Sequence, residues 1–379
     1  MTFLGRFSLP GFNLLNEIGI VIISLICVAI IFDDLNKKLF INQKLATIGL
    51  IFFIFLIWNI LSAIVNSNLF EYGSSRIITI VVVASVFISA GMIANAGLNQ
   101  GKNKYLYENA FIILFLVSSP IYLFFYKYIG DDLINKNNIG MIFFCFSSVI
   151  LYFDFFKNRR YIIFFIFLFY ILTLLIISAR SSFLGLITLL IFYFGHKFIV
   201  KNKVIYYFIF LNLCFSIFLI IFIVAFSNQN SYILRFNDLL IDLFRKRFLT
   251  GRDVMWPKLI ETINENPYFG LGPAIHPGDI TGFGLSAHNI YLQIGLQAGY
   301  IGLTIFLLLI FLIWHYLYNL RFTHHGKSMI AIFAGTLIIN TFESTLTQNN
   351  VAYGIIFWLL SGLSIGEVIK LNQENKISN

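Results

Sequence analysis

Residues 204–226 read VIYYFIFLNLCFSIFLIIFIVAF, and the polar segment 227–289 follows directly. An apolar run of this length crosses the roughly 30 Å hydrocarbon core of a bilayer as one helix. In lipid, a helix satisfies all of its own backbone hydrogen bonds, which an open loop cannot do. A polar segment as long as 227–289 between two membrane helices therefore indicates chemistry or recognition at the membrane surface.

The rest of the chain has the composition of a membrane protein. Of its 379 residues, 59% are hydrophobic and 11% are charged, whereas a soluble domain carries about 25% charged residues. We predict an all-α polytopic integral membrane protein with about 11–12 transmembrane helices and one large outer loop containing short amphipathic helices. The apolar runs lie near residues 13–32, 45–65, 76–97, 107–126, 137–153, 161–178, 182–199, 204–226, 290–314, 328–346 and 351–369.

Basic residues predict the orientation of these helices. They gather in alternate connections, and the positive-inside rule assigns such connections to the cytoplasm. The loop 227–289 then lies outside the cytoplasm and the carboxyl tail inside. This distribution accounts for the formal charge of +9 without a nucleic-acid partner. The basic connections contain Lys37, Lys38, Lys44, Lys102, Lys104, Lys157, Arg159, Arg160, Lys197, Lys201, Lys203, Arg321 and Lys327.

The sequence predicts neither a metal site nor a cofactor site. Cys27, Cys145 and Cys214 lie inside apolar runs without CxxC spacing, which is typical of packing residues. The aspartate pairs at 33–34 and 131–132 lack a histidine or a third carboxylate at ligand spacing. We interpret both pairs as solvated loop acids.

The polar loop contains two helical patterns. Residues 233–248 place their apolar side chains on one face, which predicts a helix lying in the membrane interface. A second helix is expected to begin near Asp253, with Pro257 in its first turn, and to rest on the membrane. Residues 266–287 are rich in glycine and proline and predict an irregular, tightly turned loop. The apolar stripe of the second helix comprises Met255, Trp256, Leu259 and Ile263.

Arg180 and Arg252 are candidate ligands for phosphate. Arg180 lies in the short turn 178–182 on the outer side, where the positive-inside rule predicts few arginines. Arg252 lies at the start of the second loop helix, in line with Trp256. A guanidinium offers a fork of donors that fits phosphate oxygens and keeps its charge. Arg180 is therefore either an interfacial contact to lipid phosphate or an anchor for an anionic ligand, and Arg252 is either an ordinary surface arginine or a contact to lipid phosphate.

His288, at the junction of the polar loop and the next apolar run, is the candidate general base. Imidazole accepts a proton near neutral pH, although a capping role is the alternative. His276 in the same loop is the second candidate for the base. Glu343, in the run 328–346, is either functional or the ion-pair partner of an outer arginine. Further supporting candidates are Arg76, Tyr291 and Trp256.

These residues together resemble the bacterial O-antigen ligase/polymerase (Wzy/WaaL-like) family of membrane glycosyltransferases. The resemblance covers roughly residues 175–305, and elsewhere the chain is similar only as a polytopic membrane protein. The residues that carry it are Ser178–Ser182, Gly251-Arg252, Trp256, Asn266–Pro273, His288–Gln293 and Gly299–Gly302.

The resemblance implies a multi-pass enzyme of the bacterial inner (cytoplasmic) membrane whose active site faces the periplasm and needs neither cofactor nor metal. Its donor would be an oligosaccharide on undecaprenyl pyrophosphate, with a prenyl tail entering from the lipid. Arg180 and Arg252 match the family arginines that engage pyrophosphate, and His288 matches the family base. The acceptor would be a glycan or lipid A–core. Membrane lipids and a chain-length regulator are further candidate partners.

The predicted organisation has three parts: an N-terminal transmembrane bundle of about eight spans at 1–226, a periplasmic catalytic loop at 227–289, and a C-terminal bundle of about three spans at 290–379. The leading hypothesis is a surface-polysaccharide polymerase that works by metal-independent inverting transfer. An O-antigen ligase acting on lipid A–core or a protein is the alternative with the same chemistry. A polysaccharide or lipid-linked sugar flippase is the alternative of another class, but it would carry its charges near the membrane midplane.

Overall fold

We describe the protein from a computed structural model. The structure describes residues 43–67, 73–95, 136–154, 160–227, 235, 251–282, 286–347 and 351–377. Within these residues every regular element is a helix, which confirms the predicted all-α class. The elements are α2 (Gln43–Val65), α3 (Gly73–Asn95), α5 (Lys136–Phe153), α6 (Arg160–Ile177), α7 (Arg180–Phe194), α8 (His196–Ile199), α9 (Lys203–Ala225), α11 (Arg252–Glu265), α12 (Pro277–Thr281), α13 (Ile290–Leu317), the 3₁₀ helix η3 (Tyr318–Leu320), α14 (His324–Asn340) and α15 (Val351–Ile377).

The described helices have the length and composition of membrane spans. Five of them are long and apolar enough to cross a bilayer, namely those built on α2, α3, α9, α13 and α15, and α5, α6 and α7 are shorter apolar helices. They correspond to predicted runs, with the run 182–199 divided at Gly195 into α7 and α8. The predicted runs 13–32 and 107–126 and the predicted interface helix 233–248, apart from Arg235, lie outside the described residues.

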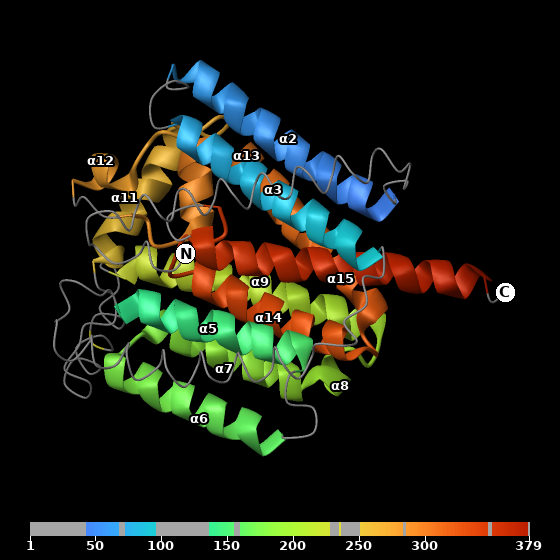
Figure 1. Ribbon diagram of the computed structural model, residues 1–379. Coiled ribbons are helices and arrows are strands. Elements are labelled where there is room, and N and C mark those ends of the chain that lie inside the picture. The colour runs from blue at the N-terminus through green and yellow to red at the C-terminus, as the bar shows by residue number, and fades with distance from the viewer. Residues whose placement is uncertain are drawn as a thin grey trace, which may run out of the picture.

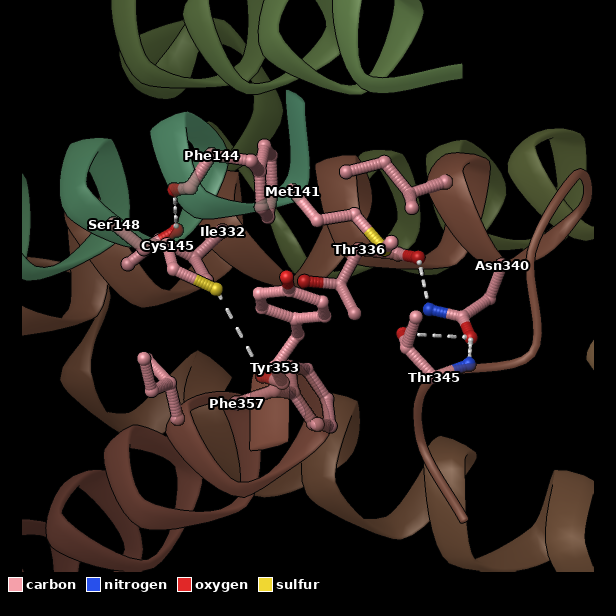
Figure 2. A pocket seen from close by; sticks show the side chains of 13 residues that line it. Met141, Phe144, Cys145, Ser148, Ile332, Thr336, Asn340, Thr345, Tyr353 and Phe357 are labelled. Atoms are coloured by element: carbon pink, nitrogen blue, oxygen red, sulfur yellow. Dashed lines mark hydrogen bonds between the residues drawn. The ribbon is translucent and has the colours of Figure 1, made fainter. Parts of the chain in front are cut away.

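The predicted run 328–346 is wrong at its end, because α14 stops at Asn340. The Asn340 amide ends the helix by bonding across the turn that follows. It donates to the Thr336 carbonyl at 2.9 Å, and its oxygen accepts from the Thr345 backbone N–H at 3.0 Å. Figure 2 shows these bonds beside a small cavity of about 20 Å³ between α5, α14 and α15. Residues 341–347 are therefore a loop and not membrane helix.

The helices form a bundle with the short loop helices at one end (Figure 1). α2 and α3 lie along one side, α6 lies along the opposite side, and α11 and α12 lie together at the left end of the view. α15 packs along α3, and α14 packs along α7. Small residues allow the first of these contacts, because Gly362 and Gly366 lie against the backbone of Phe87 and Gly91.

A break in α13 holds the polar loop against the bundle. Gly299 has φ 67° and ψ −173°, a conformation outside the helical region that glycine alone adopts easily. The break frees carbonyls of the preceding turn, and backbone N–H groups of the loop bond to them. Leu271 N donates to Leu296 O at 2.8 Å, and Gly272 N donates to Gln297 O at 3.1 Å. The loop is thus attached to the membrane helix through main-chain hydrogen bonds.

α2 supports the same break from the other side. Trp58 Nε1 donates to the Ala298 carbonyl at 2.8 Å, and the Trp58 ring stacks on Phe269 with centroids 4.8 Å apart. The Ser62 hydroxyl lies 2.6 Å from Phe269 O and 2.8 Å from Gln297 O. A broken helix is tolerated at membrane depth only when such groups satisfy its freed carbonyls. The amino-terminal part of the chain therefore helps to position the loop.

α11 packs on protein along its apolar face. The predicted stripe is confirmed, because all four of its side chains are buried, but they contact the ends of α9 and α13 and not the membrane. α11 begins at Arg252, one residue before the predicted start, after Gly251 with φ 83°. Pro257 consequently lies beyond the first turn, so the prediction for its position was wrong. Pro257 has no N–H to donate to the helix ladder, yet α11 continues to Glu265.

Candidate active site

Residues from distant parts of the chain meet where α7, α11 and α13 approach the loop 341–347. Arg180 is the first residue of α7, Arg252 is the first residue of α11, and His288 lies two residues before α13 begins. Burial lowers the pKa of Arg252, Glu343 raises it, and Arg180 lowers it again by charge repulsion. Both other charges therefore lie within electrostatic range of Arg252. An arginine keeps its proton in proteins, so the site holds two guanidinium charges.

His288 and Glu343 form a side-chain pair. His288 Nδ1 lies 3.4 Å from Glu343 Oε2, and Asn137 Nδ2 donates to Glu343 Oε1 at 2.8 Å. The Glu343 side chain is 6% exposed and that of His288 is 29% exposed, so the acid lies beneath the imidazole. An ionised carboxylate only accepts hydrogen bonds. This contact consequently favours the tautomer with the proton on Nδ1, which leaves Nε2 as the basic nitrogen.

The backbone around His288 is held in an uncommon conformation. His288 has a backbone φ of 46°, which residues other than glycine seldom adopt. Asn289 follows as the N-cap of α13, with its side-chain oxygen accepting from Leu292 N at 2.9 Å. Its amide nitrogen donates to Thr341 O, also at 2.9 Å. Asn289 therefore joins the start of α13 to the loop that carries Glu343.

Arg252 and Trp256 fasten α11 to the same neighbourhood. Arg252 Nη2 donates to the Phe342 carbonyl at 3.1 Å, and its guanidinium lies 5.7 Å from the Phe342 ring centroid. Trp256 is fully buried, and its Nε1 donates to Ala287 O at 3.0 Å. Trp256 therefore joins α11 to the residue that precedes His288.

The remaining predicted residues have no described hydrogen bond to Arg252, His288 or Glu343. His276 is the N-cap of α12, where its Nδ1 accepts from Gly278 N at 3.2 Å and Asp279 completes a capping box. Tyr291 is buried and donates to Leu337 O at 3.3 Å. Arg76 is half-buried in the first turn of α3, and no described contact joins it to Arg252 or Glu343. The structure thus favours His288 over His276 as the candidate base.

Sequence reasoning missed Asn137 and Phe342 altogether and gave Asn289 no role of its own. Asn289 lies in the quoted segment His288–Gln293, so its position beside the candidate base was a usable signal. Asn137 gives no such signal, because it contacts Glu343 across 206 positions of sequence.

An apolar groove of about 730 Å³ begins beside the site. It lies between α9, α11 and α13, and Tyr291 and Leu292 line it one turn after His288. Ile260 and Ile263 of α11 line the same wall, and phenylalanines of α9, among them Phe222, line the opposite one. The groove has the apolar surface that a hydrocarbon chain requires.

Residues 165–307 match a sequence model of the family described as O-antigen ligase. The matched part contains Arg180, Arg252 and His288, but neither Asn137 nor Glu343. The match confirms the predicted resemblance to O-antigen ligase/polymerase-like proteins and indicates an enzyme of the glycosyltransferase type within a multi-pass membrane protein. No curated protein matches the chain.

Proposed function

We propose that this chain, whose residues 165–307 match the O-antigen ligase family, is a surface-polysaccharide polymerase of the bacterial inner membrane. It would join oligosaccharide units carried on undecaprenyl pyrophosphate, with residues 227–289 as a periplasmic catalytic loop between two transmembrane bundles. The observation that carries the proposal is the meeting of Arg180, Arg252 and the His288–Glu343 pair at one end of the bundle.

The arginines would hold the pyrophosphate of the donor. As the bond between the anomeric carbon and the pyrophosphate oxygen breaks, negative charge develops on undecaprenyl pyrophosphate. Two preorganised guanidiniums would stabilise that charge more strongly than water does, because they need no reorganisation during the reaction. Pyrophosphate is already an activated leaving group, so the reaction requires neither a covalent intermediate nor a metal ion.

His288 would act as the general base. Its Nε2 would take the proton from the acceptor hydroxyl while that oxygen forms the new bond to the anomeric carbon, which inverts the configuration there. Glu343 would accept the Nδ1–H of the imidazolium that results and stabilise its charge. Asn137 would fix the carboxylate from behind. The products are the lengthened glycan, undecaprenyl pyrophosphate and one proton, which is held on His288.

The apolar groove between α9, α11 and α13 supports a prenyl-linked donor. Tyr291 and Leu292 line it, and only Ile290 separates them in sequence from His288 and Asn289. A donor whose pyrophosphate lies at Arg252 would place its first isoprene units in this groove, whose surface is as apolar as the lipid from which the tail enters.

The nearest alternative is a ligase that transfers the finished glycan to lipid A–core or to a protein. Its donor and its chemistry would be the same, so the acceptor alone separates it from a polymerase. A flippase is the alternative of another class. The candidate charges Arg180, Arg252 and Glu343 lie at the ends of helices and in a loop. This placement favours an enzyme that works at the membrane boundary.

The test uses the full-length protein, purified and placed in vesicles with an undecaprenyl-pyrophosphate oligosaccharide from the native host. Reactions contain EDTA throughout, with or without lipid A–core, and the products are separated on a gel. A ladder of increasing length without lipid A–core supports the polymerase. Product formed only with lipid A–core identifies a ligase, and no covalent product in either reaction, with movement of the donor across the bilayer, identifies a flippase.

A further inference from the structure

A second apolar cleft lies at the opposite end of the bundle from the candidate active site. α7 begins at Arg180 and ends at Phe194, and α14 begins at His324 and ends just before the loop that carries Glu343. Tyr193 and His324 therefore lie at the far ends of these helices, and both line the cleft. Its volume is about 800 Å³. It opens between α6 on one side and α5, α7 and α14 on the other.

The body of the cleft is apolar and elongated. From Ile163 to Ile171 it follows α6, a distance of about 12 Å at roughly 1.5 Å per residue. Phe167 and Leu168 line it on α6, and Leu190 lines it on α7. Long apolar side chains at the edge of the cleft are exposed at the surface of the bundle, and Phe164 has an exposed fraction of 64%. A cleft of this shape fits an extended hydrocarbon chain.

The mouth of the cleft carries charges of both signs. Lys327 of α14 places its ammonium 3.8 Å from the Tyr193 ring centroid, which holds it at the rim. His324 Nε2 lies 2.7 Å from the Leu151 carbonyl, so Nε2 carries a proton and donates to it. The other ring nitrogen faces Asp154 at 4.0 Å. Lys327, His324 and Asp154 all line this one cleft.

We propose that the cleft binds a glycerophospholipid whose headgroup carries a primary ammonium, as in phosphatidylethanolamine. The lipid phosphate lies at Lys327, the headgroup ammonium lies at Asp154, and one acyl chain extends along α6 toward Ile171. Lysine binds phosphate oxygens as a point charge, and the carboxylate accepts hydrogen bonds from an ammonium. The cleft has an apolar lining and carries one basic and one acidic side chain at its opening, which matches the chemistry of this lipid class.

Asp154 decides between an ammonium headgroup and an anionic one. A lipid with an uncharged or acidic headgroup would satisfy Lys327 but would leave the Asp154 carboxylate facing a headgroup that cannot neutralise it. The carboxylate is 24% exposed, so it is partly desolvated at the rim. His324 Nδ1, at 4.0 Å, is beyond hydrogen-bond distance, and a headgroup ammonium in direct contact would offset this cost. The cleft should therefore prefer phosphatidylethanolamine to phosphatidylglycerol.

The inference does not depend on the proposed catalysis, because the two sites lie at opposite ends of the same helices. Under the predicted orientation, the connections near Lys157 and Lys327 face the cytoplasm. The lipid would then belong to the cytoplasmic leaflet, while the sugar chemistry would take place at the outer surface.

Native mass spectrometry of the full-length protein tests this preference with an equimolar mixture of phosphatidylethanolamine and phosphatidylglycerol. We expect bound phosphatidylethanolamine to exceed phosphatidylglycerol. Asp154→Asn should reduce that ratio by roughly three- to tenfold, because a charged hydrogen bond at a partly exposed rim is lost. Lys327→Gln should weaken the binding of both lipids. Lys203→Gln removes a lysine that is exposed and lies outside the cleft. It should change neither the ratio of the two lipids nor the amount of lipid bound.

A second measurement locates the lipid. Phosphatidylethanolamine with a photoreactive acyl chain should label peptides of α6 and the end of α7. Leu190→Trp fills the cleft wall and should remove that labelling, while the elution volume and the helical circular dichroism stay as in the wild type. An unchanged lipid ratio in Asp154→Asn, or equal labelling in Leu190→Trp, would overturn the proposal and indicate ordinary annular lipid.

Discussion

At the scale of single residues, three features of the structure fix the position of His288. Its backbone adopts a left-handed φ of 46°, its ring pairs with Glu343, and the next residue, Asn289, bonds to Thr341. A conformation that costs of order 1–3 kcal/mol persists only where the surroundings enforce it. The imidazole is thus placed above Glu343 by the fold itself and does not reach its position through free rotation of a surface loop.

Replacing His288 with alanine should abolish transfer while the protein still inserts into the membrane. Loss of a general base costs about 10²–10⁴-fold in rate, and the His288 side chain is 29% exposed and lies outside the buried apolar clusters. The assay is polymer formation from the lipid-linked donor. His276→Ala is the matched control, because that histidine caps α12 and should cost stability without removing the base. Substantial activity in His288→Ala would contradict the assignment.

Glu343→Gln should lower the turnover number. Glutamine keeps the shape and accepts a hydrogen bond from Nδ1–H, but it lacks the negative charge that stabilises the imidazolium. We expect a loss of at least about tenfold in kcat, equivalent to roughly 1.4 kcal/mol. Asn137→Asp should also lower kcat, since it places a second carboxylate against Glu343 in place of a donor. A change confined to KM would assign Glu343 to binding instead.

Arg252→Lys should impair transfer even though the charge is retained. Lysine cannot reproduce the planar fork that grips phosphate oxygens, and it would lose the geometry of the bond to the Phe342 carbonyl. Arg321→Lys is the control at the other end of the bundle, where Arg321 lies over the Tyr318 and Phe322 rings. Steady-state kinetics with varied donor should show the defect in Arg252→Lys alone. Equal kinetics in the two variants would remove Arg252 from the pyrophosphate site.

At the scale of elements, the polar loop and the membrane helix α13 depend on each other. Gly299 breaks the helix, and backbone N–H groups of the loop segment 266–272 donate to carbonyls of the preceding turn. The sequence predicted an irregular, tightly turned loop at 266–287, but it did not predict a helix break at Gly299. The carbonyls of residues 296 and 297 accept from Leu271 and Gly272, which are separated from them by more than twenty positions. Local periodicity contains no information about such a partner.

Gly299→Ala should destabilise the protein strongly, and Gly282→Ala should do so only weakly. Both glycines have positive φ, at 67° and 75°. A Cβ at 299 would meet the Tyr268 carbonyl, whereas a Cβ at 282 has open space around it. The second variant costs about 1–2 kcal/mol of backbone strain, and the first adds a clash with main chain that cannot move without detaching the loop. Thermal unfolding in detergent compares them, and equal losses would show that the contact with Tyr268 is unimportant.

At the scale of the whole molecule, the candidate site is assembled from α5, α7, α11, α13 and the loop after α14. The sequence predicted the arginines and the histidine because positively charged groups on the outer side and an imidazole beside a membrane run are uncommon. It placed Glu343 inside or at the outer end of the run 328–346, whereas the helix ends at Asn340 and Glu343 lies in the loop that follows. It missed Asn137, whose contact exists only once the bundle has formed. The sequence thus named candidate residues whose catalytic roles stay predictions, and it anticipated an outer arginine near Glu343 but not the contact with Asn137.

Because the site joins so many elements, a ligand bound there should stabilise the entire fold. Undecaprenyl pyrophosphate at about one hundred times its Kd would add roughly 2.7 kcal/mol to the free energy of unfolding. Differential scanning fluorimetry should therefore show a raised Tm for the wild type and a much smaller rise for Arg252→Gln. Arg321→Gln loses the same charge away from the site and should respond as the wild type does. Undecaprenol, which has the tail without phosphates, separates groove binding from pyrophosphate binding. An equal rise in Tm for Arg252→Gln and the wild type would mean that the pyrophosphate binds elsewhere. A residue stabilises the ligand-bound protein only if it contributes to the affinity for the ligand.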